Sequence, residues 1–123
     1  MGMAKSFKNA GSDCKIVALE PASSPILSKG IKGAHNVEGV GLGFIPALYN
    51  PECVHSVITI EESTARKTCR DLAIREGRFC GTSSGMNVAG ALKLSKDLGP
   101  KSKVVTVACD SGLKYISEGL FDF

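Results

Sequence analysis

The sequence predicts an α/β fold: a fragment of three layers in which a mostly parallel sheet is flanked by helices. Apolar runs of strand length alternate along the chain with longer stretches whose apolar residues recur at helical spacing. Such alternation is typical of parallel strands joined by right-handed crossovers. The chain has 123 residues, enough for one domain or a piece of one, and its 43% hydrophobic content argues against disorder throughout. We therefore expect residues 1–123 to form a single partial domain.

The N-terminal half is predicted to contain one helix and one strand before a long connection. Residues 1–9 resemble the last two turns of a helix, which suggests a part of the fold upstream. Residues 15–20 form a nearly continuous apolar run closed by Pro21, as expected for a strand buried on both faces. Residues 21–51 are rich in glycine and proline, and a connection of this length inside a compact domain is usually functional or disordered.

A second strand and a helix follow that connection. The strand is predicted over residues 54–60, and Thr59 and Glu62 have the spacing of a capping box for the next helix. The buried face of that helix is marked by Ala65, Cys69, Leu72 and Ala73. Gly77 has the position of the glycine that ends a helix in a left-handed conformation.

The C-terminal part is predicted to hold two further helices and a third strand. A helix rich in small residues covers residues 84–98 and ends near Gly99. Residues 103–109 form another apolar run, predicted as a buried strand. The turn at residues 110–112 is expected to cap a last helix that reaches about residue 121.

Two glycines, Gly81 and Gly85, bracket the hydroxyl residues Thr82, Ser83 and Ser84 just before the small-residue helix. Hydroxyls at such a place can cap the free backbone amides of a helix, and the same end attracts polar or anionic ligand groups. A well-capped helix is the simpler interpretation, and both interpretations remain open on these residues alone.

Three such segments are expected to meet at one edge of the sheet. Ligands of open α/β sheets bind outside the carboxyl ends of the strands. The segments at those ends are residues 20–21, the turn at residues 82–84 and the turn at residues 109–112. Their convergence favours a binding site there over a purely structural set of caps.

Composition excludes several classes of partner. The net charge is only +3 and the lysines are scattered, so we expect no nucleic-acid partner. No apolar run is long enough for a signal peptide or a membrane span, so we expect no membrane association. The five cysteines include no C-x-x-C pair, which argues against a disulfide framework and favours the cytoplasm.

Three further motifs do not meet the requirements of the sites that they resemble. Cys53 and His55 could be two metal ligands, but no second pair has suitable spacing, so no metal site is predicted. Gly39 and Gly41 match the first two glycines of the dinucleotide fingerprint G-x-G-x-x-G, but Phe44 occupies the position of the third. A loop that approaches a ligand closely, or a merely flexible loop, remains possible. Residues 81–85 match G-x-S-x-G, yet a hydrolase needs a downstream histidine and none follows His55.

Together the motifs resemble the C-terminal half of the cysteine synthases. These are the O-acetylserine sulfhydrylases, pyridoxal-phosphate (PLP) enzymes of the tryptophan-synthase β superfamily, with cystathionine β-synthase as a relative. The resemblance covers about residues 2–121. It rests on Val-Ala-Leu-Glu-Pro at 17–21, Ser-Pro at 24–25, the glycine-rich run at 35–46, Arg-Glu-Gly at 75–77, Gly-Thr-Ser-Ser-Gly at 81–85, and Asp-Ser-Gly at 110–112 with Tyr115.

The resemblance implies a fold, a reaction and site residues. The fold would be that of PLP-dependent fold type II, and the reaction a β-replacement in cysteine biosynthesis, in which sulfide displaces acetate from O-acetylserine. Ser83 would meet the pyridine nitrogen of PLP, with Thr82 and Gly39 also at the cofactor. Gly39 and Gly41 would face the amino-acid substrate.

The departures from the family pattern imply a chain that is inactive by itself. The family's Schiff-base lysine, its substrate-carboxylate loop and its phosphate-binding loop all lie upstream of the matching stretch, so no catalytic residue is assigned here. Thr82 replaces a usual aliphatic residue, and Cys109 replaces a usual proline. The chain is thus expected to be a truncated transferase, or else a non-catalytic remnant that binds a partner. The partners implied are a homo-oligomer, another family member or serine acetyltransferase.

Overall fold

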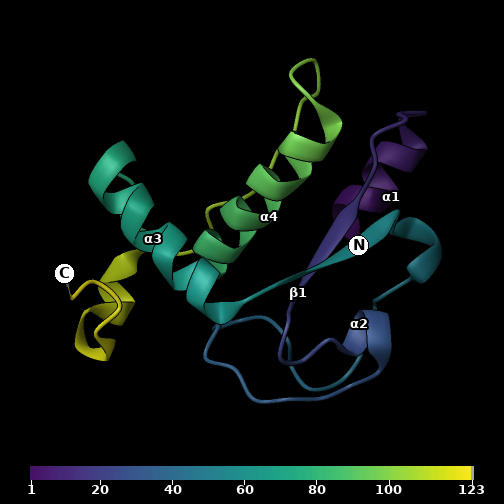
Figure 1. Ribbon diagram of the computed structural model, residues 1–123. Coiled ribbons are helices and arrows are strands. Elements are labelled where there is room, and N and C mark those ends of the chain that lie inside the picture. The colour runs from purple at the N-terminus through teal and green to yellow at the C-terminus, as the bar shows by residue number, and fades with distance from the viewer. Residues whose placement is uncertain (123) are drawn as a thin grey trace.

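The computed structural model describes residues 1–122 and centres on two parallel strands. These are β1 (Val17–Pro21) and β2 (Ser56–Ile60), and the register pairs Val17 with Ser56 and Pro21 with Ile60. Helices flank the strands: α1 (Gly2–Asn9), α2 (Ile26–Lys29), α3 (Glu62–Glu76) and α4 (Thr82–Leu98) (Figure 1). The prediction of an α/β fold with a parallel sheet flanked by helices is confirmed.

The core lies where α4 packs over the strands. Its fully buried members are supplied by the connection, by β2 and by both long helices, and they are Val37, Ile60, Ala65, Met86 and Ala89. Leu19 of β1 and Val40 of the glycine-rich connection pack against this cluster. The connection between the strands is therefore part of the core, and it is held next to the first turns of α4.

The two long helices pack through their N-terminal halves and diverge toward their C-terminal ends (Figure 1). Gly85 of α4 makes this packing possible, because a Cβ there would meet the carbonyl oxygen of Ala65 and the sulfur of Cys69. Gly90, one turn further on, similarly leaves room for the side chain of Leu19. The small residues of α4 thus allow close approach to a helix on one side and a strand on the other.

The start of α3 differs from the prediction, and its end agrees with it. Thr59 lies within β2, paired with Glu20, and the residue preceding the helix is Glu61, which makes no side-chain capping bond. The proposed capping box of Thr59 and Glu62 is wrong because the strand retains Thr59. Gly77 ends α3 in a left-handed conformation with φ of 63°, as predicted.

The start of α4 also corrects a prediction. The helix begins at Thr82, after an extended Gly81, and no side chain caps it. Thr82, Ser83 and Ser84 therefore lie inside the first turn, where they are buried, instead of preceding the helix as caps. The prediction that these hydroxyls cap the helix is wrong, and their bonding has to be traced to other groups.

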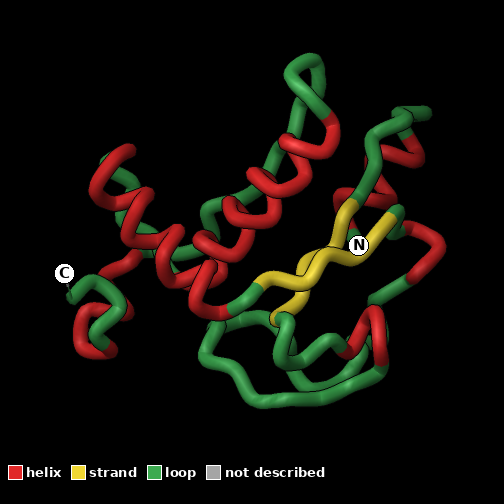
Figure 2. The backbone as a smooth tube through the Cα atoms, in the orientation of Figure 1, coloured by secondary structure: helices red, strands yellow, loops and turns green. Residues whose placement is uncertain are grey.

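Residues 103–109 were predicted to form a strand, and within residues 1–122 they do not. The segment has no sheet partner there, since the described sheet consists of β1 and β2 (Figure 2). The side chain of Val105 is 89% exposed, so the segment is also not buried. A sequence pattern suited to the middle of a parallel sheet remains unpaired when no neighbouring strand is present.

The C-terminal segment is a 3-10 helix, η2 (Gly112–Glu118), instead of the predicted helix to residue 121. Ser111 caps it as predicted, its hydroxyl accepting a hydrogen bond from the Leu113 amide at 3.3 Å. Ser111 also forms an isolated antiparallel bridge with Cys80. Gly119 ends the segment in a left-handed conformation.

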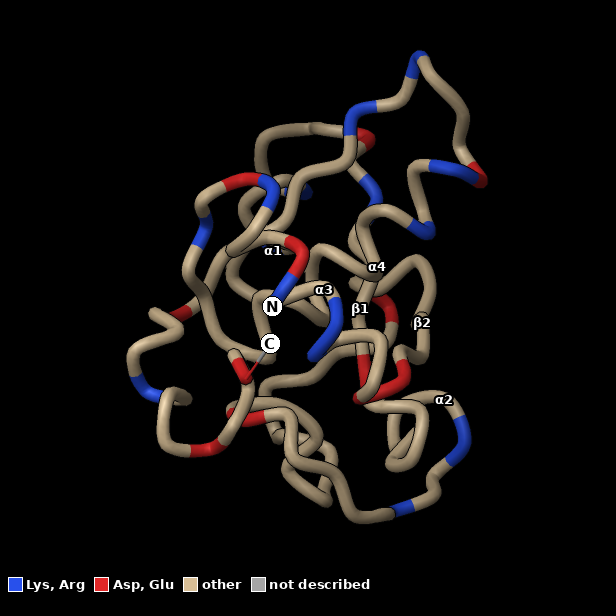
Figure 3. Tube along the Cα trace, turned by 60° about the vertical axis from the view of Figure 1, so that its left-hand side comes forward, with Lys and Arg blue, Asp and Glu red and all other residues tan. Residues whose placement is uncertain are grey.

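The connection over residues 22–50 is irregular apart from α2, and a short 3-10 helix, η1 (Pro51–Cys53), leads into β2. Glu20, only 3% exposed, anchors the connection by accepting hydrogen bonds from the amides of Leu27 (2.7 Å) and Ser28 (3.1 Å) in α2. Lysines, arginines and acidic residues intermix along the trace (Figure 3). Within residues 1–122, no helix combines the length and the apolar character required to cross a membrane.

Candidate functional site

The first turn of α4 places three hydroxyls in the interior with different bonding. The Ser84 hydroxyl accepts a hydrogen bond from the Cys109 amide at 2.8 Å, which fixes the segment after residue 108 to the helix. The Thr82 hydroxyl is buried and has no hydrogen-bond partner among residues 1–122. Ser83, between them, is 7% exposed.

The turn at residues 109–112 lies against this helix start, as the predicted convergence requires. The Gly81 amide donates to the Asp110 carbonyl at 3.1 Å, and the Gly112 amide donates to the Phe79 carbonyl at 3.2 Å. Gly81 must be a glycine because a Cβ there would meet the Asp110 carboxylate and the Tyr115 ring. Two of the three predicted segments therefore meet.

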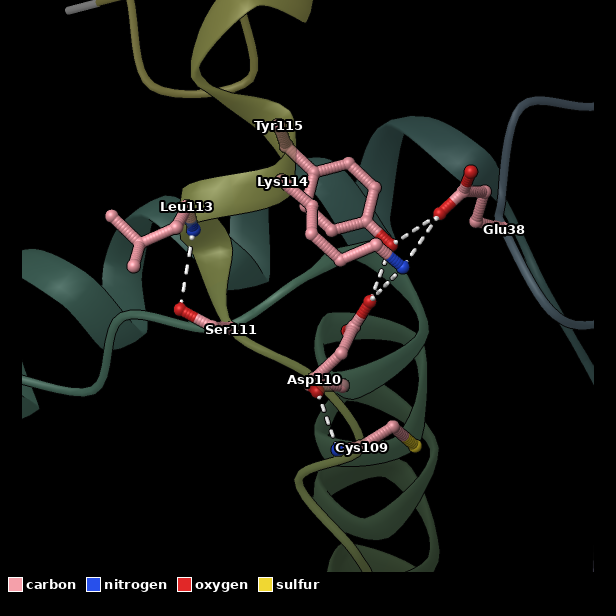
Figure 4. A network of polar contacts seen from close by, with 8 residues as sticks. Glu38, Cys109, Asp110, Ser111, Leu113, Lys114 and Tyr115 are labelled. Atoms are coloured by element: carbon pink, nitrogen blue, oxygen red, sulfur yellow. Dashed lines mark hydrogen bonds and ion pairs between the residues drawn. The ribbon is translucent and has the colours of Figure 1, made fainter.

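A polar network joins this turn to the glycine-rich connection. The Tyr115 hydroxyl faces Asp110 Oδ2 at 2.8 Å and Glu38 Oε2 at 3.0 Å, and the Lys114 ammonium lies 3.3 Å from each of the same two oxygens (Figure 4). The phenol has one proton for two acceptors, whereas the ammonium can donate to both. The two carboxylates outnumber the one cation, so the network is anionic.

The pKa shifts follow from these contacts. Burial, together with hydrogen bonds to Asp110 and Glu38, raises the pKa of Tyr115 well above its ordinary value. Hydrogen bonds to the same two carboxylates raise the pKa of Lys114. Near neutral pH, Tyr115 is therefore a hydrogen-bond donor and Lys114 a cation. The second oxygen of Asp110, Oδ1, is buried without a partner among residues 1–122.

Gly39 and Gly41 of the connection line a cavity near the end of β1. Gly39 and Gly41 have φ of 76° and 57°, and the His35 ring lies 2.9 Å from the Gly41 carbonyl through Nε2. The Val37 amide donates to His35 Nδ1 at 3.3 Å, so Nε2 carries the proton and donates to Gly41. A cavity of about 240 Å³ is lined by both glycines, Glu20 and Phe44, among others.

The structure thus brings the predicted site residues together only in part. Gly39 and Gly41 line the cavity at the end of β1, whereas Thr82 and Ser83 do not line it. Val40, between the two glycines, packs against the core cluster that contains Met86 of α4. The third predicted segment, Glu20 with Pro21, faces the glycines and α2. Its expected convergence on the other two segments stays a prediction, and the Glu20 carboxylate itself is used to bind the amides of α2.

Two thiols lie beneath this site. Cys69 is fully buried and its Sγ donates to the Gly81 carbonyl at 2.9 Å. Burial, followed by the neighbouring Cys80, raises the pKa of Cys69 to about 11. Burial also raises the pKa of Cys80. Both thiols are consequently protonated and behave as small packing residues near neutral pH.

Glu38 is the residue of this site that sequence reasoning missed. It immediately precedes Gly39, but its partner Tyr115 is 77 positions away. No local spacing connects residues so far apart. The only signal available was that Glu38 and Tyr115 both belong to the stretches that resemble cysteine synthases.

The fold and this site define a class of protein. The family described as pyridoxal-phosphate dependent enzymes matches residues 1–110, and the chain belongs to this family. The family resemblance predicted from the sequence is therefore confirmed.

The particular relatives are cysteine synthases. The chain is 39% identical over 122 residues to the cysteine synthase of Staphylococcus aureus (strain N315), covering 99% of this chain and 39% of that protein. It is 38% identical over 120 residues to cysteine synthase B of Campylobacter jejuni, covering 98% of this chain and 40% of that protein. The chain thus spans about two fifths of the length of these curated relatives.

Solved structures of related enzymes have the same fold as this chain. A cysteine synthase from Entamoeba histolytica has a TM-score of 0.91 at 33% identity, covering 99% of this chain and 36% of that one. A hydrogen sulfide-producing enzyme from Fusobacterium nucleatum has a TM-score of 0.89 at 40% identity, covering 98% of this chain and 36% of that one. At these identities the fold type II assignment is confirmed. Which stretch of the relatives corresponds to this chain remains a prediction.

The residues present fit part of a PLP site. PLP offers a pyridine nitrogen that needs a hydrogen-bonding partner, and the protein tunes the cofactor through such contacts. A hydroxyl is suited to this task because it can donate or accept. The first turn of α4 holds the Thr82 hydroxyl, which is buried without a partner among residues 1–122, and beside it Ser83, a residue that is 7% exposed.

Proposed function

We propose that this chain supplies one wall of a PLP site that carries out β-replacement of the cysteine synthase type. The observation that carries the proposal is Ser83, a residue only 7% exposed in the first turn of α4, whose hydroxyl is engaged in no helix cap. A hydroxyl held in this way is ready for a ligand atom. The curated relatives named cysteine synthases support the choice of reaction.

The role assigned to Ser83 is to meet the pyridine nitrogen of the cofactor. PLP supplies an electron sink for reactions at the amino acid's Cα and Cβ. Because a serine hydroxyl is neutral, it leaves the pyridine nitrogen largely unprotonated and so limits the strength of that sink. This moderate activation suits loss of a β-substituent such as acetate followed by addition of sulfide. The substrates proposed are therefore O-acetylserine and sulfide.

The other predicted site residues have supporting roles in this proposal. Thr82 would contribute its buried hydroxyl to the same wall of the cofactor site. Gly39 and Gly41 would present backbone groups to the amino-acid substrate, since both line the cavity at the end of β1 and lack side chains that would fill it. His35 stabilises the conformation of this loop by donating a hydrogen bond to the Gly41 carbonyl. No residue of this chain is assigned the Schiff-base role.

The experiment that tests the proposal is complementation. The purified chain is mixed with the part of the Staphylococcus aureus cysteine synthase that it does not match, and PLP binding is followed by cofactor fluorescence. Formation of cysteine from O-acetylserine and sulfide is measured in the same mixture. We expect PLP binding and activity that depend on both pieces. PLP bound stably as an imine by this chain alone would contradict the assignment.

A matched pair of serine variants tests the role of Ser83. Ser83→Ala removes the proposed contact, and Ser95→Ala removes a hydroxyl that donates to the Leu92 carbonyl on the exposed side of α4. We expect Ser83→Ala to shift the cofactor spectrum and to lower the rate at least tenfold, whereas Ser95→Ala changes neither. Equal effects of the two substitutions would refute the assignment of Ser83.

The partner proteins form a second part of the proposal. Association with another copy, with a complete family member or with serine acetyltransferase would provide a role for the chain without catalysis of its own. The mixing experiment separates the two roles: a stable complex without cysteine formation at any ratio favours the non-catalytic role. The cytoplasm remains the predicted compartment, and fractionation of the source cells tests it.

A further inference from the structure

The Tyr115 hydroxyl has two acceptors for its single proton. It lies 2.8 Å from Asp110 Oδ2 and 3.0 Å from Glu38 Oε2, and the two carboxylates converge on it (Figure 4). A phenol carries one proton, so at any moment it donates to one carboxylate and leaves the other without this bond. The ring is 1% exposed and packs with Cys69 and Leu120, so it stays in place while the proton changes direction. One fold therefore accommodates two arrangements of this hydrogen bond.

The neighbouring cation does not decide between the two arrangements. The Lys114 ammonium lies 3.3 Å from the same oxygen of each carboxylate. An ammonium has three protons and can donate to both oxygens at once. Burial, together with hydrogen bonds to Asp110 and Glu38, raises the pKa of Tyr115, so the phenol keeps its proton near neutral pH. The direction of this one proton is what distinguishes the two arrangements.

Each acceptor belongs to a different part of the candidate site. Glu38 directly precedes Gly39, which lines the cavity near the end of β1. The Asp110 carbonyl accepts a hydrogen bond from the Gly81 amide at 3.1 Å, and a Cβ on Gly81 would meet the Asp110 carboxylate. Gly81 directly precedes Thr82, the first residue of α4. A movement in the glycine loop therefore changes one acceptor, and a movement at the start of α4 changes the other.

The contact with Glu38 is the more sensitive of the two. Hydrogen bonds between two oxygens are usually about 2.5–3.0 Å long, so the Glu38 contact is at the long end of this range. Val37 is buried in the core cluster and Val40 packs against it, so the backbone on both sides of Glu38 is held. A displacement of Gly39 by a few tenths of an ångström would therefore strengthen or end this bond without unfolding the loop.

We propose that the Tyr115 hydroxyl is a two-position hydrogen-bond switch, with Asp110 and Glu38 as alternative acceptors, that couples the glycine loop to the first turn of α4. The shorter contact assigns the proton to Asp110 in this structure. A ligand that brings Glu38 closer draws the proton to Glu38 and releases Asp110, and the coupling is reciprocal. The three residues are thus positioning residues. The identity of the ligands, an amino acid at the loop and PLP at α4, rests on the proposed function, whereas the switch itself does not.

The test follows the side-chain carboxyl carbons of Asp110 and Glu38 by ¹³C NMR in the chain alone. Glu38→Asp retains the negative charge beside Lys114 and draws the acceptor away from the phenol, because the side chain is one carbon shorter. We expect the Asp110 carboxyl resonance to move by more than its linewidth, since Asp110 then holds the proton at all times. In the Tyr115→Phe chain the same substitution should leave that resonance in place. An equal displacement in both chains would overturn the proposal.

A reverse perturbation and a matched control complete this test. Asp110→Asn weakens the other acceptor, so the Glu38 carboxyl resonance should move, again only when Tyr115 is present. Glu62→Asp is the control, because Glu62 accepts a hydrogen bond from the Asn36 amide at 2.8 Å in the same connection. This control should move neither resonance. Either direction of the test decides the question if the variant for the other does not fold.

The positioning role has its own measurement in the complemented enzyme. Tyr115→Phe should raise the KM for O-acetylserine several-fold and change kcat by less than about twofold, since a contact that positions the loop acts on substrate and transition state alike. A fall in kcat with an unchanged KM would overturn the positioning role.

Failure of this proposal and failure of the proposed function can be told apart. Carboxyl displacements that depend on Tyr115, without PLP binding on complementation, would leave the switch standing and refute the cofactor wall. PLP binding and cysteine formation without such displacements would refute the switch and leave the proposed function intact.

Discussion

The Tyr115 hydroxyl lies 3.0 Å from the Glu38 carboxylate, which joins the C-terminal 3-10 helix to the residue before the first glycine of the connection. The same hydroxyl faces Asp110 at 2.8 Å, beside the start of α4. One buried phenol thus links the two groups of predicted site residues, the glycines on one side and the hydroxyls of α4 on the other. This link adds to the packing of Val37 and Val40 that holds the glycine loop next to α4.

Removal of the phenol oxygen should loosen that loop. Tyr115→Phe leaves the ring in place and removes the donor shared by Glu38 and Asp110, so we expect a loss of about 1–2 kcal/mol in the free energy of unfolding. Amide exchange over residues 38–43 should become faster. Tyr49→Phe is the control, because no hydrogen bond of the Tyr49 hydroxyl is found within residues 1–122. Equal denaturation midpoints for the two variants would contradict the proposed link.

Replacement of the unpartnered hydroxyl of α4 should increase stability. Thr82 is 1% exposed and its hydroxyl has no partner within the described chain. A buried hydroxyl without a hydrogen bond is unfavourable, so Thr82→Val should raise the free energy of unfolding of the chain alone by about 1 kcal/mol. Thr82→Ser retains the hydroxyl and loses a methyl group, so it should lower stability. If Thr82→Val is destabilising, the hydroxyl has a partner in the folded chain.

The same substitution separates stability from function. If the Thr82 hydroxyl belongs to the cofactor wall, Thr82→Val should bind PLP more weakly in the complemented enzyme although it is the more stable chain. Cofactor fluorescence and urea denaturation measure the two effects independently. Unchanged PLP affinity would remove Thr82 from the proposed site and leave Ser83 unaffected.

The contact between α3 and α4 should not tolerate a methyl group at Gly85. A Cβ there would meet the backbone of Ala65 and the Cys69 sulfur, and neither has a flexible end that can move aside. Overpacking of this kind usually costs about 1–3 kcal/mol, and Gly85→Ala should lie at the upper end or beyond. Gly2→Ala is the control, because it lies in the helix α1 with nothing within 4 Å of the added carbon. Thermal denaturation compares the two.

Stability should fall at alkaline pH because of Cys69. Its pKa is raised from 9.0 to about 11, so the folded chain retains a proton that the unfolded chain loses above pH 9. The stabilisation is complete below pH 9 and is lost as pH rises to about 11, at no more than about 1.4 kcal/mol per pH unit for one thiol. Cys69→Ser can still donate to the Gly81 carbonyl and does not titrate in this range. Urea denaturation from pH 8 to 11 should show a shallower decline for this variant, and parallel curves would contradict the assignment.

The sequence predicted the strands and helices well where local pattern determines them. Gly77 ends α3 as its position indicated, because a left-handed helix end requires little beyond the local backbone. Thr59 had the spacing of a helix cap but is retained by β2, since strand pairing is a property of distant residues. Residues 103–109 had the composition of a buried strand, but no partner for them exists within residues 1–122.

The site residues that belong to short local motifs could also be selected from the sequence, whereas those joined by long-range contacts could not. Ser83, Gly39 and Gly41 belong to short motifs and could be selected from the sequence, but their cofactor and substrate roles remain predictions. The network of Glu38 and Tyr115 could not be selected, because two side chains 77 positions apart become neighbours only when the chain folds. Contacts of this type require coordinates, even when both residues lie in stretches that resemble a family.

The parallel pairing of β1 with β2 also affects the order in which the chain folds. Val17 pairs with Ser56, a separation of 56 − 17 = 39 residues, whereas Ala65 and Met86 belong to adjacent helices in the sequence. Closing the longer loop costs more entropy before any contact compensates for it. The α3–α4 pair should therefore form in the folding nucleus, with substitutions there slowing refolding. Substitutions in β1 should mainly accelerate unfolding, so the glycine-rich loop would gain its final shape last.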